Sequence, residues 1–225
     1  GTAELVTGRL PRTALVLAGY ALMIFAAMRL LLEALSVPRK AGERRFPLPG
    51  SAPLWLGALL LACWLPWFVC LFPGTVSNDS ISQLKEIMGL VPMSNANPVF
   101  QTWLLGAFRQ AGLWLGSADA GVALYCMMQA VLTAWLLGTV LDGIRRNAAP
   151  RWLFWAALAF YALCPIFPAF AFCVGKDTNF AMAVLFLSLM VGRVVDEPGR
   201  CGAARAAGLC AAAVLCVLLR NPGIY

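Results

Sequence analysis

Long runs of apolar residues constrain the fold of this chain more than any other feature. A helix needs about 20 apolar residues to cross a hydrocarbon core of ~30 Å. Three runs of that length contain no charged side chain, and two shorter ones end at arginines that can reach toward the headgroups. Another run is interrupted only by Arg29 and Glu33, four residues apart on one predicted helix face. We predict an all-α, polytopic membrane bundle, one domain over residues 1–225, with six spans at 13–35, 53–72, 120–141, 152–172, 178–192 and 206–219.

The composition excludes several other classes of protein. Hydrophobic residues make up 61% of the chain and charged residues 12%, whereas a soluble domain carries about half and about a quarter. A soluble enzyme, a nucleic-acid-binding domain and a disordered tail are therefore poor interpretations. Because the chain has no histidine and its eight cysteines form no CxxC pair, we expect no zinc site, no histidine-based triad and no disulfide framework. We also expect no nucleotide cofactor and no nucleic-acid partner.

The basic residues predict which ends of the spans face the cytoplasm. The net charge is +7, and ten of the basic residues fall in three loops that the positive-inside rule places inside: Arg39, Lys40, Arg44, Arg45, Arg145, Arg146, Arg151, Arg193, Arg200 and Arg205. The basic loops before 53–72 and after 120–141 are both predicted to lie inside, and these two runs already supply one crossing outward and one back. A further crossing by residues 99–116 would place Arg145, Arg146 and Arg151 outside. This apolar segment contains Gln101 and Arg109, and it follows Asn97 and Pro98, a predicted N-cap and first helical residue. It therefore predicts an interfacial helix.

This topology brings three polar segments to one extracytoplasmic face. The first is a long loop, residues 73–119, that contains the interfacial helices. The second is the turn at 165–177, where Pro165 and Pro168 predict a break at the end of the preceding helix. The third begins at Arg220. Two cations beside an acid at this level suit a lipid-linked phosphate, although a Lys-Asp pair and a helix-end arginine also serve as simple interfacial anchors.

Asp79 is the candidate catalytic residue, and its carboxylate also has a purely structural interpretation. Residues 77–83 read as the start of a short surface helix, with Ser80 and Gln83 at capping-box spacing. We expect Asp79 and Gln83, one turn apart, to point the same way, off the apolar stripe formed by Ile81, Leu84 and Met88. A carboxylate at a helix start can act as a cap, but three neighbouring residues can also cap. The alternative is a general base for an acceptor hydroxyl.

An ordered set of short motifs resembles an uncharacterised family of bacterial multi-spanning membrane proteins that is distantly similar to the GT-C glycosyltransferases. The resemblance covers residues 53–225. The motifs are Phe72-Pro73-Gly74, Asn78-Asp79-Ser80, Gln83, Asn97-Pro98, Thr102, Tyr125, Gln129, Lys176-Asp177 and Arg220-Asn221-Pro222-Gly223-Ile224-Tyr225. The sequence departs from the family pattern at Asn97, where His is usual, and at Asn221-Pro222-Gly223, where Asn-Asn-Gly is usual.

The resemblance implies a function. A polyprenyl-phosphate-linked sugar would be the donor, and transfer would take place on the outer leaflet of the bacterial cytoplasmic membrane. Asp79 would be the base or would orient the acceptor. On charge and sidedness, Lys176 and Arg220 would hold the donor phosphate, together with the other candidate binding residues Asp177, Gln83, Asn97 and Asn221. We predict no protein-built metal site, and use of Mg²⁺ or Mn²⁺ stays open because GT-C branches differ.

Two other functions stay open at this point. The first is a transporter or flippase of a lipid-linked or anionic substrate, which would use the proline-broken helix and the same charges. The second is a non-catalytic membrane scaffold, in which the outer charges are anchors. Residue 1 is glycine, and Tyr225 closely follows an apolar run, so we expect the chain to be a fragment of a longer protein.

Overall fold

The computed structural model describes residues 51–93, 97–146, 149–196 and 202–220. Within these ranges the chain is mostly helical, with one pair of two-residue strands. The helices are α3 (Ala52–Leu71), α4 (Asn78–Ile87), α5 (Val99–Trp114), α6 (Ala118–Arg146), α7 (Arg151–Leu163), α8 (Ile166–Ala171), α9 (Lys176–Asp196) and α10 (Ala203–Leu219), and the strands are β1 (Thr75–Val76) and β2 (Cys173–Val174). The predicted span at 13–35 lies outside the described residues, as does Asn221.

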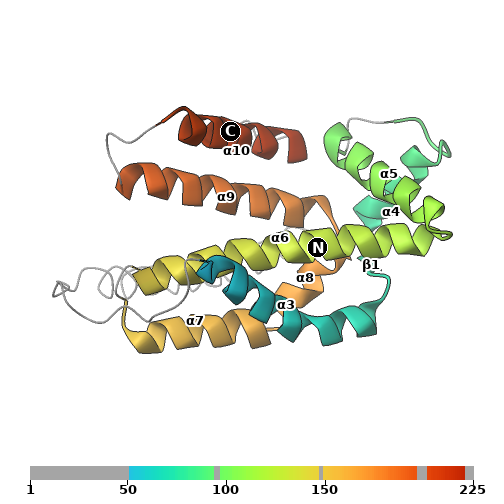
Figure 1. Ribbon diagram of the computed structural model, residues 1–225. Coiled ribbons are helices and arrows are strands. Elements are labelled where there is room, and N and C mark those ends of the chain that lie inside the picture. The colour runs from blue at the N-terminus through green and yellow to red at the C-terminus, as the bar shows by residue number, and fades with distance from the viewer. Residues whose placement is uncertain (1–50, 94–96, 147–148, 197–201, 221–225) are drawn as a thin grey trace, which may run out of the picture.

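The long helix α6 is the centre of the described bundle (Figure 1). It packs against α3 and α7 on one side and against α9 on the other, and α10 packs on α9. The core where these elements meet contains Leu60, Trp64, Tyr125 and Leu141, all fully buried. Helix α5 also packs on α6, but it runs obliquely across the end of the bundle rather than along it (Figure 1).

Two glycines allow α3 and α6 to pack backbone to backbone. A Cβ added at Gly57 would lie 3.0 Å from the Ala134 carbonyl oxygen. A Cβ added at Gly138 would lie 2.7 Å from the Gly57 nitrogen and closer still to the Pro53 carbonyl oxygen. Small residues at such crossings are typical of helices that associate without a hydrophobic driving force between them. This contact fixes the position of α3, and therefore of the turn that leads from it to β1.

The sequence predicted the helices well and the helix ends less well. The apolar runs at 53–72, 120–141, 178–192 and 206–219 lie in α3, α6, α9 and α10. The run at 152–172 is divided into α7 and α8, because proline at 165 has no N–H to continue the helix. The predicted break is therefore confirmed, but it lies inside the apolar run rather than at the end of it.

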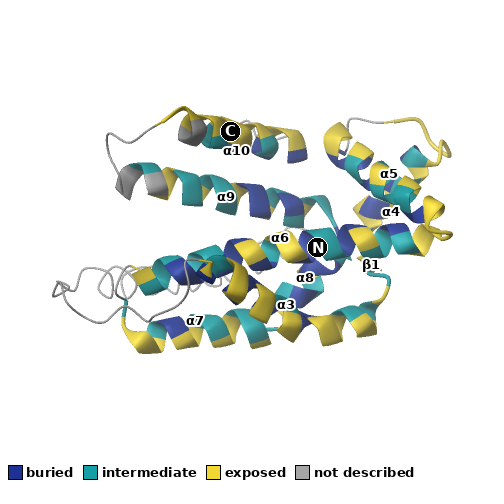
Figure 2. Cartoon of the chain, viewed as in Figure 1, coloured by how far each residue is buried: buried dark blue, intermediate teal, exposed yellow. Residues whose placement is uncertain are grey.

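Two of the described helices, α3 and α6, are long and apolar enough to cross a membrane by length and composition. Helix α7 and residues Ala206–Leu219 are apolar but shorter. Figure 2 shows many exposed residues along α3 and α7, and large apolar residues are among them. Trp55 and Trp152, for example, are 63% and 66% exposed. A contiguous apolar exterior of this kind is unusual for a soluble monomer.

The polar segments of the described chain lie at the two ends of the bundle. Helix α6 ends at Arg145 and Arg146, both paired with Asp142, at the end of the bundle where α7 and α10 begin (Figure 1). The opposite end carries α4, α5, the start of α9 and the end of α10. Residues from the three predicted outer segments therefore meet at one end of the molecule.

Candidate functional site

The site is built on a short parallel pairing of β1 and β2. Thr75 lies opposite Cys173, and Val76 lies opposite Val174. The Thr75 N–H donates to the Phe172 carbonyl at 2.9 Å. Gly74 makes the preceding turn with a φ of +134°, and a Cβ there would collide with the Cys126 thiol. The pairing places the starts of α4 and α9 side by side, although they are far apart in the sequence.

The start of α4 differs from the predicted capping box. Ser77 is the N-cap, and its hydroxyl accepts a hydrogen bond from the Ser80 N–H at 3.3 Å. The Ser80 side chain instead donates to the Val174 carbonyl of β2 at 2.5 Å. Ser80 is therefore buried against the strand pair and does not form a box with Gln83. Because Ser77 caps the helix, Asp79 is not needed for that purpose.

The buried face of α4 is also not the predicted one. Ser80 and Gln83 are buried, whereas Ile81 and Met88 are exposed. The anchoring of Ser80 to β2 sets this rotation of the helix. Asp79 and Gln83 differ in environment although they lie one turn apart in α4, since the Asp79 side chain is 58% exposed and Gln83 is 1% exposed. Neither polar atom of the Gln83 amide has a hydrogen-bond partner among the described residues.

Asp79 and Lys176 form an ion pair at the junction of α4 and α9. The Lys176 Nζ lies 2.8 Å from the Asp79 Oδ2 and donates to the Asn97 Oδ1 at 3.2 Å. The Lys176 side chain is 19% exposed and Asn97 is buried. The predicted capping role of Asn97 is wrong, because Pro98 occupies the N-cap of α5 and no side chain caps that helix. Asn97 instead helps to fix the ammonium group.

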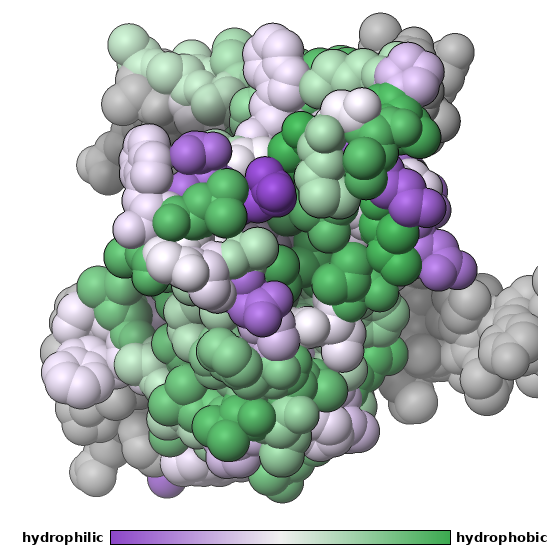
Figure 3. All heavy atoms as spheres, turned by 90° about the vertical axis from the view of Figure 1, so that its right-hand side faces the viewer, coloured by the Kyte–Doolittle hydropathy of each residue, from purple (hydrophilic) through white to green (hydrophobic). Residues whose placement is uncertain are grey.

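A second, looser pair lies beside the first. The Arg220 guanidinium is 3.7 Å from the Asp177 carboxylate and 5.3 Å from the centre of the Phe180 ring. Asp177 follows Lys176 directly at the start of α9, and Arg220 follows the last residue of α10. The four charged residues predicted for the site therefore form two adjacent pairs with no net charge. Figure 3, which views this end of the bundle, shows hydrophilic residues interspersed with apolar ones.

Below the ion pairs lies a buried amide network that the sequence did not predict as a unit. The Asn179 Nδ2 donates to the Gln101 Oε1 at 2.9 Å and to the Tyr125 hydroxyl at 2.6 Å. The Gln101 Nε2 donates to the same hydroxyl at 2.5 Å. All three side chains are buried. One feature of the sequence could have indicated this network: Asn179 is a polar residue one turn after Lys176, at the start of an apolar run.

Gln129 joins α6 to the turn that carries β2. Its Nε2 donates to the carbonyls of Phe170, Ala171 and Cys173 at 2.9, 3.1 and 2.9 Å. The irregular backbone after α8 is therefore satisfied from inside the bundle, as a low-dielectric environment requires. This contact holds the base of α9, and with it Lys176, against α6.

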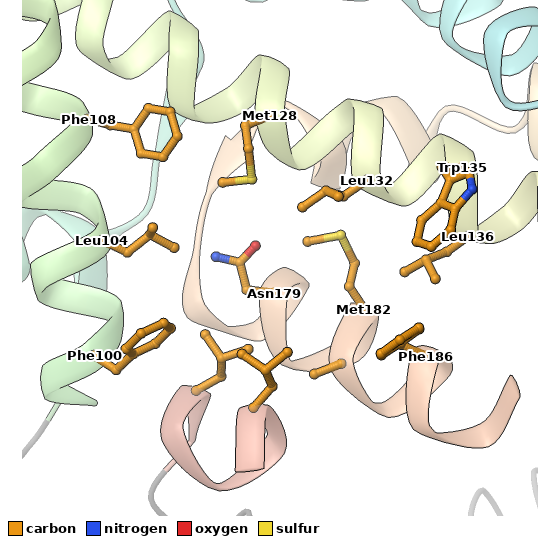
Figure 4. Close-up of a pocket in the computed structure, with 13 residues that line it drawn as sticks. Phe100, Leu104, Phe108, Met128, Leu132, Trp135, Leu136, Asn179, Met182 and Phe186 are labelled. Carbon is orange, nitrogen blue, oxygen red and sulfur yellow. The ribbon is translucent and has the colours of Figure 1, made fainter. Parts of the chain in front are cut away.

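An apolar cavity of about 430 Å³ lies between α5, α6, α9 and α10. Asn179 is its polar lining residue, and the others are Phe100, Leu104, Phe108, Met128, Leu132, Trp135, Leu136, Met182, Ala183, Phe186, Leu215 and Leu219 (Figure 4). The volume is in the range of small-molecule sites, about 300–1,000 Å³. Leu219 precedes Arg220, and Asn179 is one turn from Lys176, so the cavity approaches the cationic side chains.

The described residues contain no group of three or more His, Cys, Asp or Glu side chains that could hold a metal ion. Asp79 and Asp177, the two acids of the site, are each paired with a cation. Both cations of the site are therefore already paired with carboxylates.

Residues 90–225, more than half of the chain, match the Family of unknown function (DUF6020), and the chain belongs to this family. No curated protein and no solved structure matches the chain. The matched residues include Asn97, Gln101, Lys176, Asn179 and Arg220, and they begin after Asp79.

Proposed function

We propose that the chain is a multi-pass protein of the bacterial cytoplasmic membrane and that it transfers a sugar from a polyprenyl-phosphate donor to an acceptor at the extracytoplasmic face, as a GT-C-like glycosyltransferase. The apolar exterior and the two span-length helices support the membrane location. Six spans would include 13–35 and the shorter apolar helices, with flanking arginines extending to the headgroups. Helices α4 and α5, at the end of the bundle, would lie in the interface.

The observation that carries the proposal is the contact of Asp79 and Asn97 with Lys176, which begins the helix whose Asn179 lines the apolar cavity. The Asp79–Lys176 distance of 2.8 Å puts an acid and a cation in one cluster, and Arg220 supplies a second cation nearby. An amphiphilic donor needs both features, because its phosphate requires fixed positive partners and its chain requires an apolar groove. The arrangement supports a lipid-linked phosphate more than a soluble one.

In the proposed reaction, the Asp79 carboxylate takes the proton of an acceptor hydroxyl. The acceptor oxygen attacks the anomeric carbon, and the bond from that carbon to the phosphate oxygen breaks. The phosphate leaves with the bonding electrons, and Lys176 and Arg220 stabilise its charge. Asn97 and Asp177 orient the two cations, and the unpaired Gln83 amide and Asn221 complete the binding of the substrates.

The experiment is sugar transfer by the purified protein with a polyprenyl-phosphate-sugar donor. Asp79→Asn should abolish transfer while leaving expression and thermal unfolding unchanged. Asp119→Asn is the matched control, because it removes an exposed acid from the first turn of α6, at the same end of the bundle, and should leave transfer intact. Normal transfer by Asp79→Asn would remove this residue from the mechanism.

A transporter or flippase is a second candidate, favoured by the break between α7 and α8. Transporters often bind substrates where a membrane helix is interrupted. Saturable accumulation of a lipid-linked or anionic substrate in proteoliposomes, with no covalent product, would favour transport over transfer. The absence of both activities would favour a scaffold.

A further inference from the structure

The cavity contains one polar contact point, and the hydrogen bonds around Asn179 define its chemistry. Gln101, Tyr125 and Asn179 contact one another in a closed triangle. The orientation of the two amides follows from the donors available. Flipping only the Asn179 amide would place its oxygen against the Gln101 oxygen, and flipping only the Gln101 amide would place its nitrogen against the Asn179 nitrogen. Flipping both would place two amide oxygens against the Tyr125 hydroxyl, which has a single hydrogen to donate.

This network commits the Nδ2 of Asn179 to its two neighbours and leaves its Oδ1 as an acceptor. No hydrogen bond to that oxygen is made by the residues that the structure describes, and Asn179 lines the cavity among apolar side chains (Figure 4). A purely hydrocarbon occupant would leave the oxygen unpaired, at a cost in free energy. An occupant with an O–H or N–H group at this level would pair it.

The position of Asn179 also fixes where that group lies along the ligand. Asn179 is three residues after Lys176 in α9, or about 4.5 Å along the helix axis. At the other wall of the cavity, Leu219 is followed directly by Arg220. Both cations therefore lie at the same end of the cavity, and charge complementarity places the anionic head of an amphiphile there.

We infer that the cavity binds a single-chain anionic lipid that carries a hydroxyl or amide N–H close to its head, and that Asn179 selects this lipid over one with a plain hydrocarbon chain. The inference shares Lys176 and Arg220 with the proposed function but requires no chemical step. Its occupant is a hydroxyacyl or N-acyl chain, which would use the same cavity and the same two cations as the proposed polyprenyl donor and would therefore compete with that donor for the site.

The test uses two ligands that differ by one hydroxyl group, tetradecanoate and 3-hydroxytetradecanoate, titrated by calorimetry into the purified full chain in detergent. The hydroxylated acid should bind about 2- to 10-fold more tightly, as expected for one net hydrogen bond. Asn179→Leu should bring the ratio of the two affinities close to one. Met128→Leu is the matched control, because it changes an apolar side chain of the same cavity, keeps the Asn179 triangle intact, and should preserve the ratio.

Three results would overturn the inference: equal affinities of the wild-type protein for the two acids, a preference that survives in Asn179→Leu, or no saturable binding of either acid. If Asn179→Leu does not fold, the comparison of the two acids on the wild-type protein decides alone. Because the readout is binding, a failure here leaves sugar transfer untested and unaffected, and a failure of sugar transfer does not change the expected affinities.

Discussion

Replacing Asp79 with asparagine should raise the affinity of the protein for an anionic lipid, although it removes the proposed base. The Asp79 carboxylate lies 2.8 Å from the Lys176 ammonium, so a phosphate that binds Lys176 must compete with it. Asparagine keeps the shape of the side chain and removes its charge. The ammonium is then left with the Asn97 oxygen as its described partner, and an incoming anion meets less competition and less repulsion.

The exposure of the two side chains sets the size of this effect. Asp79 is 58% exposed and Lys176 is 19% exposed, so the pair is closer to a surface pair than to a buried one. Surface pairs contribute about 0.2–1 kcal/mol, which corresponds to an increase in affinity of about 1.4- to 5-fold. Because exposed charges are screened by salt, the increase should become smaller as ionic strength rises.

The assay is a titration of dodecyl phosphate into the wild-type protein, Asp79→Asn and Asp119→Asn, at low and high salt. Asp79→Asn should bind more tightly than the other two, and Asp119→Asn should match the wild type. An affinity for Asp79→Asn that is equal to or below that of the wild type would show that Asp79 does not compete for Lys176, and would refute the reasoning.

Three further predictions concern the supports of the site. Gly138→Leu should destabilise the protein by about 1–3 kcal/mol or more, because the leucine side chain would collide with the backbone of α3. Thermal unfolding measures this loss, and Gly143→Ala is the control at a position with open space around it. Gln129→Leu should lower the free energy of unfolding by about 1–3 kcal/mol in the same assay, since three carbonyls lose their donor. An unchanged melting temperature would show that Gln129 does not stabilise the turn that carries β2. Lys176→Met should weaken dodecyl phosphate binding more than Arg220→Met, because Lys176 is the less exposed cation.

The helices and the meeting of charges at one end could be predicted because both depend on local features of the sequence. Apolar runs of sufficient length specify α3, α6, α9 and α10 without reference to their neighbours. The clusters of basic residues predict which helix ends share a side, and this prediction puts Asp79, Lys176 and Arg220 at one end of the bundle, where the two ion pairs lie.

The details of the site could not be predicted, because they depend on contacts between distant segments. Ser80 is buried because it donates to Val174, and nothing near Ser80 in the sequence indicates that strand pair. Asn97 follows the expected pattern of a helix cap but bonds Lys176 instead. The triangle around Asn179 joins three helices, and a polar residue in an apolar run indicates a partner without identifying it.

The most direct test of the account is the side of the membrane on which the ionic cluster lies. In intact cells, with the native cysteines replaced, a membrane-impermeant maleimide should label Ser82→Cys in α4 and should label Ala203→Cys at the start of α10 only after permeabilisation. Both positions are exposed, and they lie at opposite ends of the bundle. Labelling of both positions in intact cells, or of Ala203→Cys alone, would contradict the proposed extracytoplasmic site.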